Sequence, residues 1–124
     1  MNTKTNNIIV WILAGLLAFA FFGSGVTKLI GAEMQVKNFD SWGYPQWLRY
    51  PIGLAEIAFA VGLLLAKYRT YTIYAIYFWA IVAIITHFQA GQVSMIGGPI
   101  IFAVLNTLLL WRWKKTGKHQ PASL

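Results

Sequence analysis

Four long apolar runs, separated by short polar segments, dominate the pattern of hydrophobic and polar positions along the chain. Within these runs the apolar residues are nearly continuous, and they do not alternate with polar residues as in a half-buried strand. About 20 helical residues cross the hydrocarbon core of a bilayer, so the runs have the length of membrane spans. We therefore predict an all-α polytopic membrane protein: a four-transmembrane-helix bundle forming one domain over residues 1–124, with spans at about 8–30, 47–66, 71–88 and 95–113.

The segments between the runs predict how the helices connect. Only KYRT (67–70) separates the second and third runs, so we expect a tight helical hairpin there. Pro51 lies near the start of the second run and predicts a kink or an interfacial first turn. GGP (97–99) interrupts the fourth run, whose helix therefore either starts at Pro99 behind a re-entrant loop or is broken. The segment MQVKNFDSW (34–42) is typical of an amphipathic interfacial turn or short helix.

The composition supports the membrane class and excludes several others. Hydrophobic residues make up 58% of the 124 residues and charged residues only 10%, whereas a soluble domain has about 25% charged residues. The net charge of +7 could indicate a nucleic-acid partner, but the basic residues lie at the ends of the apolar runs, so we expect none. Cysteine is absent, which excludes thiolate metal sites and thiol redox chemistry by the residues of this chain.

The distribution of lysine and arginine predicts the orientation of the bundle. With four spans, the N-terminus, the KYRT segment and the C-terminus share one side of the membrane. That side carries seven basic residues: Lys4, Lys67, Arg69, Arg112, Lys114, Lys115 and Lys118. The opposite side carries Lys37 and Arg49, with Lys28 near its boundary. Because cytoplasmic segments are enriched in lysine and arginine, we predict that both termini are cytoplasmic.

Two ionisable residues lie inside the apolar runs, where a charge at the bilayer centre costs at least ~2.5 kcal/mol on insertion scales. Lys28 lies near the end of the first run and shares a helical face with Ser24. Glu56 lies in the second run, roughly 13 Å deeper than Trp47 at the start of that run. A Lys28–Glu56 pair would offset the desolvation of both charges. Alternatively, Lys28 extends outward to the interface and Glu56 takes up a proton.

Polar side chains elsewhere are candidate members of this intramembrane centre. Ser24 is one, although a hydroxyl at such a position often bonds to its own helix backbone, which we expect here. His87 lies at a helix end, where a solvated interfacial histidine is the alternative to a site role. We expect Asn106 to form an interhelical hydrogen bond and Trp79 to provide core or lipid-facing bulk. The candidates lack metal-ligand spacing, so we predict no metal site, and we assign no catalytic residue.

Two stretches resemble a known family: GVTKLIG (25–31) and NFDSWGYPQWLRYPIGLAEIAFAVGLLL (38–65). A first helix rich in small residues and ending in a lysine, a Gly-Tyr-Pro loop, and Gly-x-x-Glu followed by leucines are similar to the DoxX-like family of small four-helix bacterial membrane proteins. The lysine and glutamate of that pattern correspond to Lys28 and Glu56. The third and fourth helices resemble the family only in hydropathy. The resemblance implies a multi-pass protein of the bacterial inner (plasma) membrane.

The resemblance implies an accessory or assembly subunit. The family is named after a membrane subunit of a thiosulfate:quinone oxidoreductase, and distant animal relatives assist the assembly of other membrane proteins. The residues argue against a stand-alone redox enzyme, because no cysteine can hold an iron–sulfur cluster and one intramembrane histidine cannot form a bis-histidine haem. We expect no intrinsic cofactor; electrons would pass through a bound quinone or a partner redox subunit. The alternative is a small oligomeric carrier or proton-linked permease in which Glu56 titrates.

The expected partners are therefore the lipid bilayer and another membrane protein or redox subunit. Small residues of the first run, Gly15, Ala18 and Gly25, could also form contacts in a homo-oligomer. Because small residues equally allow close packing between helices of one chain, we expect them to be used within the bundle.

Overall fold

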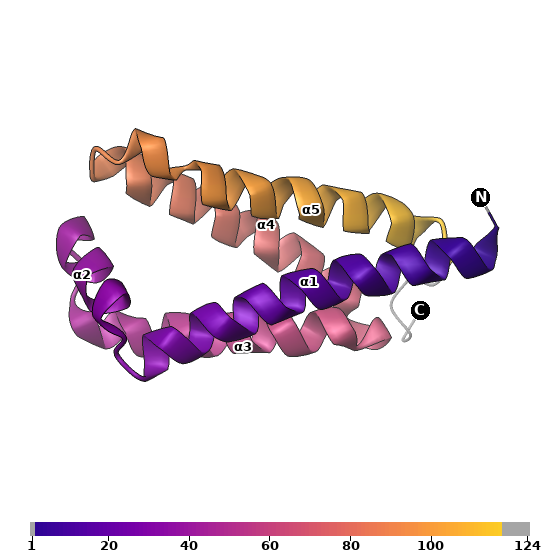
Figure 1. Ribbon diagram of the computed structural model, residues 1–124, viewed down its shortest axis with the longest axis horizontal. Coiled ribbons are helices and arrows are strands. Elements are labelled where there is room, and N and C mark those ends of the chain that lie inside the picture. The colour runs from indigo at the N-terminus through magenta and orange to yellow at the C-terminus, as the bar shows by residue number, and fades with distance from the viewer. Residues whose placement is uncertain (1, 118–124) are drawn as a thin grey trace.

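The computed structural model describes residues 2–117, which fold almost entirely into helices (Figure 1). Within this range there are five α-helices: α1 (Thr3–Leu29), α2 (Glu33–Trp42), α3 (Arg49–Leu64), α4 (Ala66–Gln89) and α5 (Gly97–Lys114). Two 3-10 turns, η1 (Gln46–Leu48) and η2 (Val93–Met95), precede α3 and α5. The described residues contain no strand. The predicted all-α class is confirmed.

Four helical segments are long and apolar enough to cross a membrane: Thr3–Leu29, Gln46–Leu64, Ala66–Gln89 and Val93–Lys114. Many of their large apolar side chains point away from the bundle; for example, Phe19 is 82% exposed and Phe78 is 71% exposed. An apolar surface of this extent is unusual for a soluble monomer and fits contact with lipid. The prediction of a polytopic membrane protein with four spans is confirmed.

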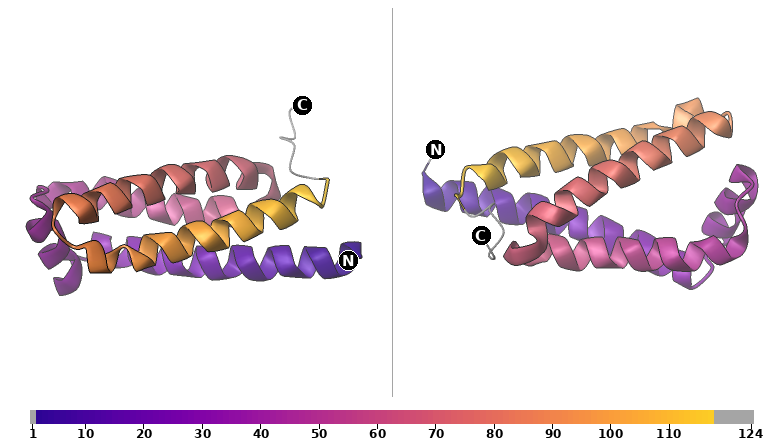
Figure 2. Two further views of the ribbon diagram at one scale, coloured as in Figure 1. Left: turned by 90° about the horizontal axis from the view of Figure 1, so that it is seen from above. Right: turned by 180° about the vertical axis from the view of Figure 1, so that it is seen from behind.

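The four spanning helices form a ring of contacts. The α1 helix packs most extensively along α3, α3 contacts α4, α4 contacts α5, and α5 returns to α1. Figures 1 and 2 show two pairs, α1 with α3 and α4 with α5, which diverge toward the end that carries α2. We call this end the loop end. The start of α1 and the end of α5 lie at the opposite end, which we call the terminal end (Figure 1).

The buried apolar core lies along the inward faces of the four spanning helices. Its side chains come from α1 (Val10, Ala14, Leu17, Ala18 and Phe21), α3 (Ala60 and Leu63), α4 (Ile73 and Ile76) and α5 (Leu109 and Trp113). On α1 these positions recur at three- and four-residue spacing, so they form one inward stripe. Ala18 is thus used within the bundle, as expected, whereas a Cβ added at Gly15 would meet no atom within 4 Å.

The turn between α3 and α4 is shorter than the sequence predicts. A single residue, Leu65, with φ −100° and ψ 114°, separates the two helices, and the KYRT segment lies inside α4. The predicted placement of KYRT between the helices is therefore wrong. Arg69 explains the difference, because it turns inward and donates from Nε to the carbonyl oxygen of Leu63 at 2.7 Å. This bond satisfies a backbone acceptor in the last turn of α3.

Pro51 and Pro99 each lie in the first turn of a helix. Pro51 is the third residue of α3 and follows η1, so of the two predicted alternatives the structure has the first-turn position. The α5 helix starts at Gly97, two residues before Pro99, and continues unbroken to Lys114. A broken fourth helix is therefore excluded. The 3-10 turn η2 adds to the length of this span at the loop end.

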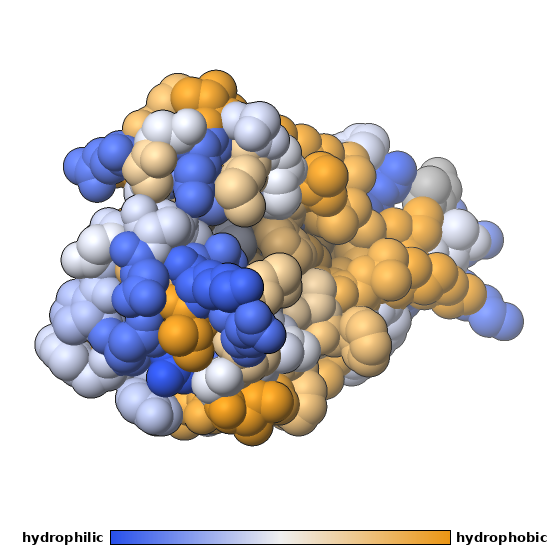
Figure 3. Space-filling view, turned by 60° about the vertical axis from the view of Figure 1, so that its left-hand side comes forward, coloured by the Kyte–Doolittle hydropathy of each residue, from blue (hydrophilic) through white to orange (hydrophobic). Residues whose placement is uncertain are grey.

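The segment predicted to be an interfacial helix forms α2, which covers the loop end. Phe39 points inward and is fully buried, whereas Glu33 and Lys37 on the outer face form an exposed ion pair at 2.9 Å. Figure 3 shows hydrophilic residues gathered on this end of the molecule and apolar residues along its sides. Two side-chain bonds join this region to the α4 end: Trp42 Nε1 to Gln92 Oε1 at 2.8 Å, and Tyr44 to Thr86 at 2.7 Å.

The basic residues are concentrated at the terminal end, as the four-span arrangement requires. The described members are Lys4, Lys67, Arg69, Arg112, Lys114 and Lys115, and Lys118 lies outside the described residues. The cytoplasmic placement of this end remains a prediction from the charge distribution.

Candidate functional site

Two glycines bring the backbones of α1 and α3 into contact. A Cβ added at Gly25 would lie 2.6 Å from the carbonyl oxygen of Gly53 and 2.7 Å from Cγ1 of Ile57. A Cβ added at Gly53 would lie 2.9 Å from the carbonyl oxygen of Gly25. Because residues three apart share a helical face, the crossing also brings together Lys28 and Glu56, each three positions beyond one of these glycines.

Lys28 and Glu56 form a direct, buried ion pair. Nζ of Lys28 lies 2.9 Å from Oε1 of Glu56, and the two side chains are 9% and 1% exposed. Of the two arrangements that the sequence left open, the structure adopts the pair. Each charge offsets part of the desolvation of the other, which is costly for an isolated charge in an apolar interior.

The hydroxyl of Ser24 connects the two charged groups. Its Oγ accepts a hydrogen bond from Lys28 Nζ at 2.8 Å and donates one to Glu56 Oε1 at 3.0 Å. The expectation that this hydroxyl bonds to its own helix backbone is wrong. That role belongs to Thr27, whose Oγ1 donates to the carbonyl oxygen of Ser24 at 2.9 Å.

Trp79 of α4 completes the network, and the sequence interpretation missed it. Its Nε1 donates to Oε2 of Glu56 at 3.0 Å. Its ring packs edge-on against Phe21 and Phe102, with centroids 5.0 and 5.5 Å apart. The available signal was the indole N–H itself, because a tryptophan in mid-span usually needs an acceptor that lipid tails do not offer. Treating Trp79 only as bulk overlooked this donor.

Ser24, Lys28, Glu56 and Trp79 form a polar centre whose hydrogen-bonding groups bond to one another. Glu56 Oε1 accepts from Lys28 and Ser24, and Oε2 accepts from Trp79, so groups of α1 and α4 converge on one carboxylate of α3. The formal charges cancel, and the buried polar atoms found without a partner among residues 2–117 belong to other residues. Such a network can fix the relative position of three helices.

His87 lies in a different cluster, at the loop end. Its Nδ1 is 3.0 Å from Gln92 Oε1, the oxygen that also accepts from Trp42, and its ring meets the Trp42 ring edge-on. Gln92 Nε2 donates in turn to Ser41 at 3.2 Å. The structure therefore uses His87 to hold α2 against the α4 end and does not place it beside Lys28 and Glu56.

Asn106 also lies apart from the polar centre. Its side chain is fully buried, and its Nδ2 donates to the carbonyl oxygen of Ile73 at 2.9 Å. This bond joins α5 to α4, which is the interhelical role that the sequence predicts. Its Oδ1 has no hydrogen-bond partner among the described residues.

A second buried cation, Arg69, occupies the terminal end. It is 2% exposed, and its guanidinium lies over the rings of Trp11 and Trp113, at 4.9 and 4.5 Å from their centroids. Its Nη2 lacks a hydrogen-bond partner among residues 2–117. From the sequence, Arg69 was interpreted only as one of the basic residues that set the orientation. The nearby tryptophans at the ends of the first and last runs were the signal that it could be stacked inside the bundle.

The described residues contain no metal-type cluster of side chains, and two of their surface hollows lie apart from the polar centre. No three histidine, aspartate or glutamate side chains within residues 2–117 lie together as a metal site would need. One surface hollow is lined by residues of α1 between Thr3 and Ile12, and another by Glu33, Met34, Lys37 and Asn38 of α2. Neither hollow includes Lys28 or Glu56.

Comparison with known proteins gives a family match. The model of the DoxX-like family matches residues 12–109, more than half of the 124 residues, and this range includes the whole polar centre. No curated protein and no solved structure matches the chain.

Proposed function

The chain belongs to the DoxX-like family, and from this premise we propose that it is an accessory or assembly subunit of a membrane protein complex. We place it in the bacterial inner membrane with both termini in the cytoplasm, as the basic residues of the terminal end favour. In this proposal the Lys28–Glu56 pair sets how α1 packs on α3, and the lipid-facing surfaces of the bundle receive the partner.

This proposal rests on one observation: both carboxylate oxygens of Glu56 already have hydrogen-bond donors. The carboxylate is 1% exposed, and donors from α1 and α4 occupy both of its oxygens. A general base or a ligand-binding carboxylate must present a free oxygen to its substrate, at least through one water. Glu56 is instead arranged to hold helices together, which is what a subunit without its own chemistry requires.

The lipid-facing surface supports a partner role for the spanning helices. Large apolar and aromatic side chains cover the outer face of α4, among them Tyr74, Phe78, Ile81 and Ile85. In a bilayer such a face is covered by lipid tails or by a helix of another protein. We propose another membrane protein or redox subunit as the partner, and a second copy of this chain as the alternative.

We propose a quinone site only at the interface with a partner protein, and not within the polar centre. The groups of the polar centre that could donate to a quinone carbonyl are Lys28 Nζ, Ser24 Oγ and Trp79 Nε1, and all three already bond to Glu56. A quinone would have to displace these bonds and leave the carboxylate short of donors, at a cost of about 1–3 kcal/mol per lost bond. The polar centre as packed therefore does not fit a quinone head group.

A carrier or proton-linked permease is the second candidate. The observation that favours it is an ionisable pair inside four apolar helices, a position where transporters place their proton relays. The two helix pairs also diverge toward the loop end (Figure 2). This candidate requires that Glu56 exchange its three donors during a transport cycle.

Native mass spectrometry and ultraviolet–visible absorption of the protein, extracted in the mildest detergent that keeps it monodisperse, separate these candidates. The accessory-subunit proposal predicts that a second protein co-purifies at a defined stoichiometry. A near-stoichiometric quinone that is retained without a partner and lost in Glu56→Gln would contradict it in favour of an intrinsic quinone site. A bare protein whose Glu56→Gln variant loses solute uptake in vesicles would instead support the carrier.

A further inference from the structure

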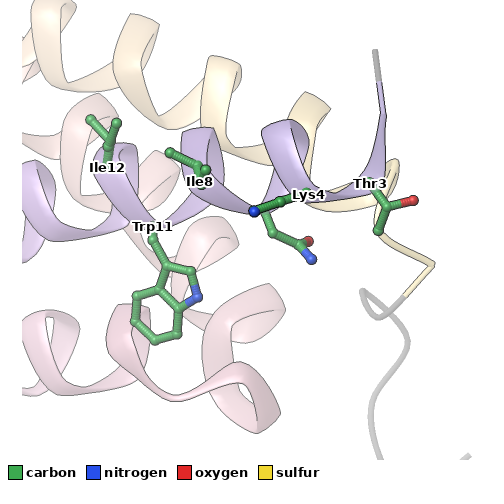
Figure 4. Close-up of a pocket in the computed structure, with 6 residues that line it drawn as sticks. Thr3, Lys4, Ile8, Trp11 and Ile12 are labelled. Carbon is green, nitrogen blue, oxygen red and sulfur yellow. The ribbon is translucent and has the colours of Figure 1, made fainter.

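A shallow groove runs along the start of α1 at the terminal end. It has a volume of about 730 Å³ and is lined by Thr3, Lys4, Asn7, Ile8, Trp11 and Ile12 (Figure 4). The lining changes character along the helix: the first three residues are polar and the last three are apolar. From Lys4 to Ile12 the helix rises about 12 Å, which is the depth from the headgroup region into the upper acyl chains.

The charge around this groove is positive and has no acidic counterpart at the same end. Lys4 shares the terminal end with Lys67, Arg69, Arg112, Lys114 and Lys115. The chain has only three acidic residues, and Glu33 and Asp40 lie on α2 at the loop end. The third, Glu56, is paired with Lys28. The ligand that complements this end therefore carries negative charge.

Trp11 links the groove to a buried charge beneath it. The indole ring that lines the groove also stacks on the guanidinium of Arg69, with 4.9 Å between that group and the ring centroid. Arg69 is 2% exposed, has one nitrogen without a hydrogen-bond partner, and has no carboxylate in contact among residues 2–117. A positive charge of this kind, in surroundings of low dielectric constant, attracts an anion held in the groove.

We propose that this groove binds one anionic phospholipid of the leaflet that surrounds the terminal end. The phosphate interacts with Lys4 and the side-chain amide of Asn7, and an acyl chain lies along Ile8, Trp11 and Ile12. Basic residues next to a bilayer attract acidic headgroups, and a groove that is polar at one end and apolar at the other selects a lipid over a soluble anion. This inference is independent of the proposed function, since any role in the membrane is compatible with a bound lipid.

Native mass spectrometry of the full chain with added phosphatidylglycerol or phosphatidylcholine of identical acyl chains tests the proposal. We expect adducts of phosphatidylglycerol to survive activation better than those of phosphatidylcholine. Lys4→Gln should weaken phosphatidylglycerol binding about fivefold, the effect of one basic residue near an acidic surface. Lys115→Gln removes the same charge at the same end but outside the groove, and should leave binding nearly unchanged.

Three results would overturn the proposal. Equal retention of the two lipids would show that the headgroup is not recognised. Equal losses in Lys4→Gln and Lys115→Gln would show diffuse attraction to the basic end without a site. A dimer mass that is lost in Lys4→Gln, with no lipid adduct in the wild type, would identify the groove as an interface between copies of the chain.

Discussion

Gly25 and Gly53 contact each other through their backbones, and a side chain at either position would collide with the opposite helix. This crossing lies three residues before Lys28 on α1 and three residues before Glu56 on α3. The close approach and the ion pair therefore depend on each other, because a wider helix separation would draw the charged groups apart. Near the loop end, the packing of α1 on α3 thus combines a steric contact with an ion pair, in addition to the apolar contacts along the rest of the two helices.

Gly25→Ala should destabilise the bundle. The new methyl group would lie 2.6 Å from the carbonyl oxygen of Gly53, so α1 and α3 must separate, and overpacking of this kind costs about 1–3 kcal/mol. Gly15→Ala is the matched control, since a Cβ there meets nothing within 4 Å. Thermal unfolding in detergent, followed by circular dichroism, compares the two variants. Equal melting temperatures for both would show that the crossing is not a tight constraint.

Trp79→Phe should weaken the polar centre while keeping an aromatic ring against Phe21. The change removes the N–H donor to Glu56 Oε2 and leaves that buried oxygen without a partner, which costs about 1–3 kcal/mol. Trp47→Phe provides the control, because Trp47 is largely exposed at the loop end. Chemical unfolding in mixed micelles measures the free energy of unfolding of both variants. If Trp79→Phe is as stable as Trp47→Phe, the indole bond contributes nothing to folding.

Arg69→Lys should be destabilising although it preserves the charge. A lysine ammonium cannot stack flat between Trp11 and Trp113, and it loses the Nε bond to Leu63 at the α3–α4 turn. The same replacement at Arg112, which lies over the half-exposed ring of Trp111, should have a smaller effect. Hydrogen exchange of the first turns of α4 is the direct readout. Unchanged protection there in Arg69→Lys would argue against the stacking role.

The terminal end should face the cytoplasm. Because the chain lacks cysteine, single Lys115→Cys and Lys37→Cys variants can report the orientation with a membrane-impermeant maleimide applied to spheroplasts. Both positions are exposed and lie at opposite ends of the bundle. Labelling should occur at position 37 in intact spheroplasts and at position 115 only after lysis. The reverse pattern would invert the topology predicted from the basic residues.

The sequence was sufficient to predict four spanning helices, although it placed the start of the third too late. Continuous apolar runs determine where a chain can cross a membrane, and helical periodicity places Ser24 and Lys28 on the same face of α1. The pairing of Lys28 with Glu56 was one of two alternatives, because depth alone does not determine which helices are neighbours. The ring order of the helices, with α1 against α3, decides it.

The errors concern side chains whose partners come from distant parts of the chain. Trp79 was interpreted as bulk because its acceptor, Glu56, lies on another helix. Arg69 was placed in a loop because a charged residue after an apolar run usually marks its end, yet two tryptophans from α1 and α5 enclose it. His87 was a candidate member of the polar centre, although its bond leads to Gln92. Asn106 was also a candidate, but its bond to Ile73 is the interhelical contact that the sequence predicts.

Lys28 and Glu56 form a structural pair, and a double-mutant cycle on the free energy of unfolding tests whether the two side chains stabilise each other. Lys28→Met or Glu56→Leu alone leaves an uncompensated buried charge and should cost about 3–5 kcal/mol, whereas the double variant should recover most of that loss. Glu33→Gln with Lys37→Gln, at the exposed ion pair of α2, should show almost no coupling. Additive losses at Lys28 and Glu56, or single variants as stable as the wild type, would contradict the claim.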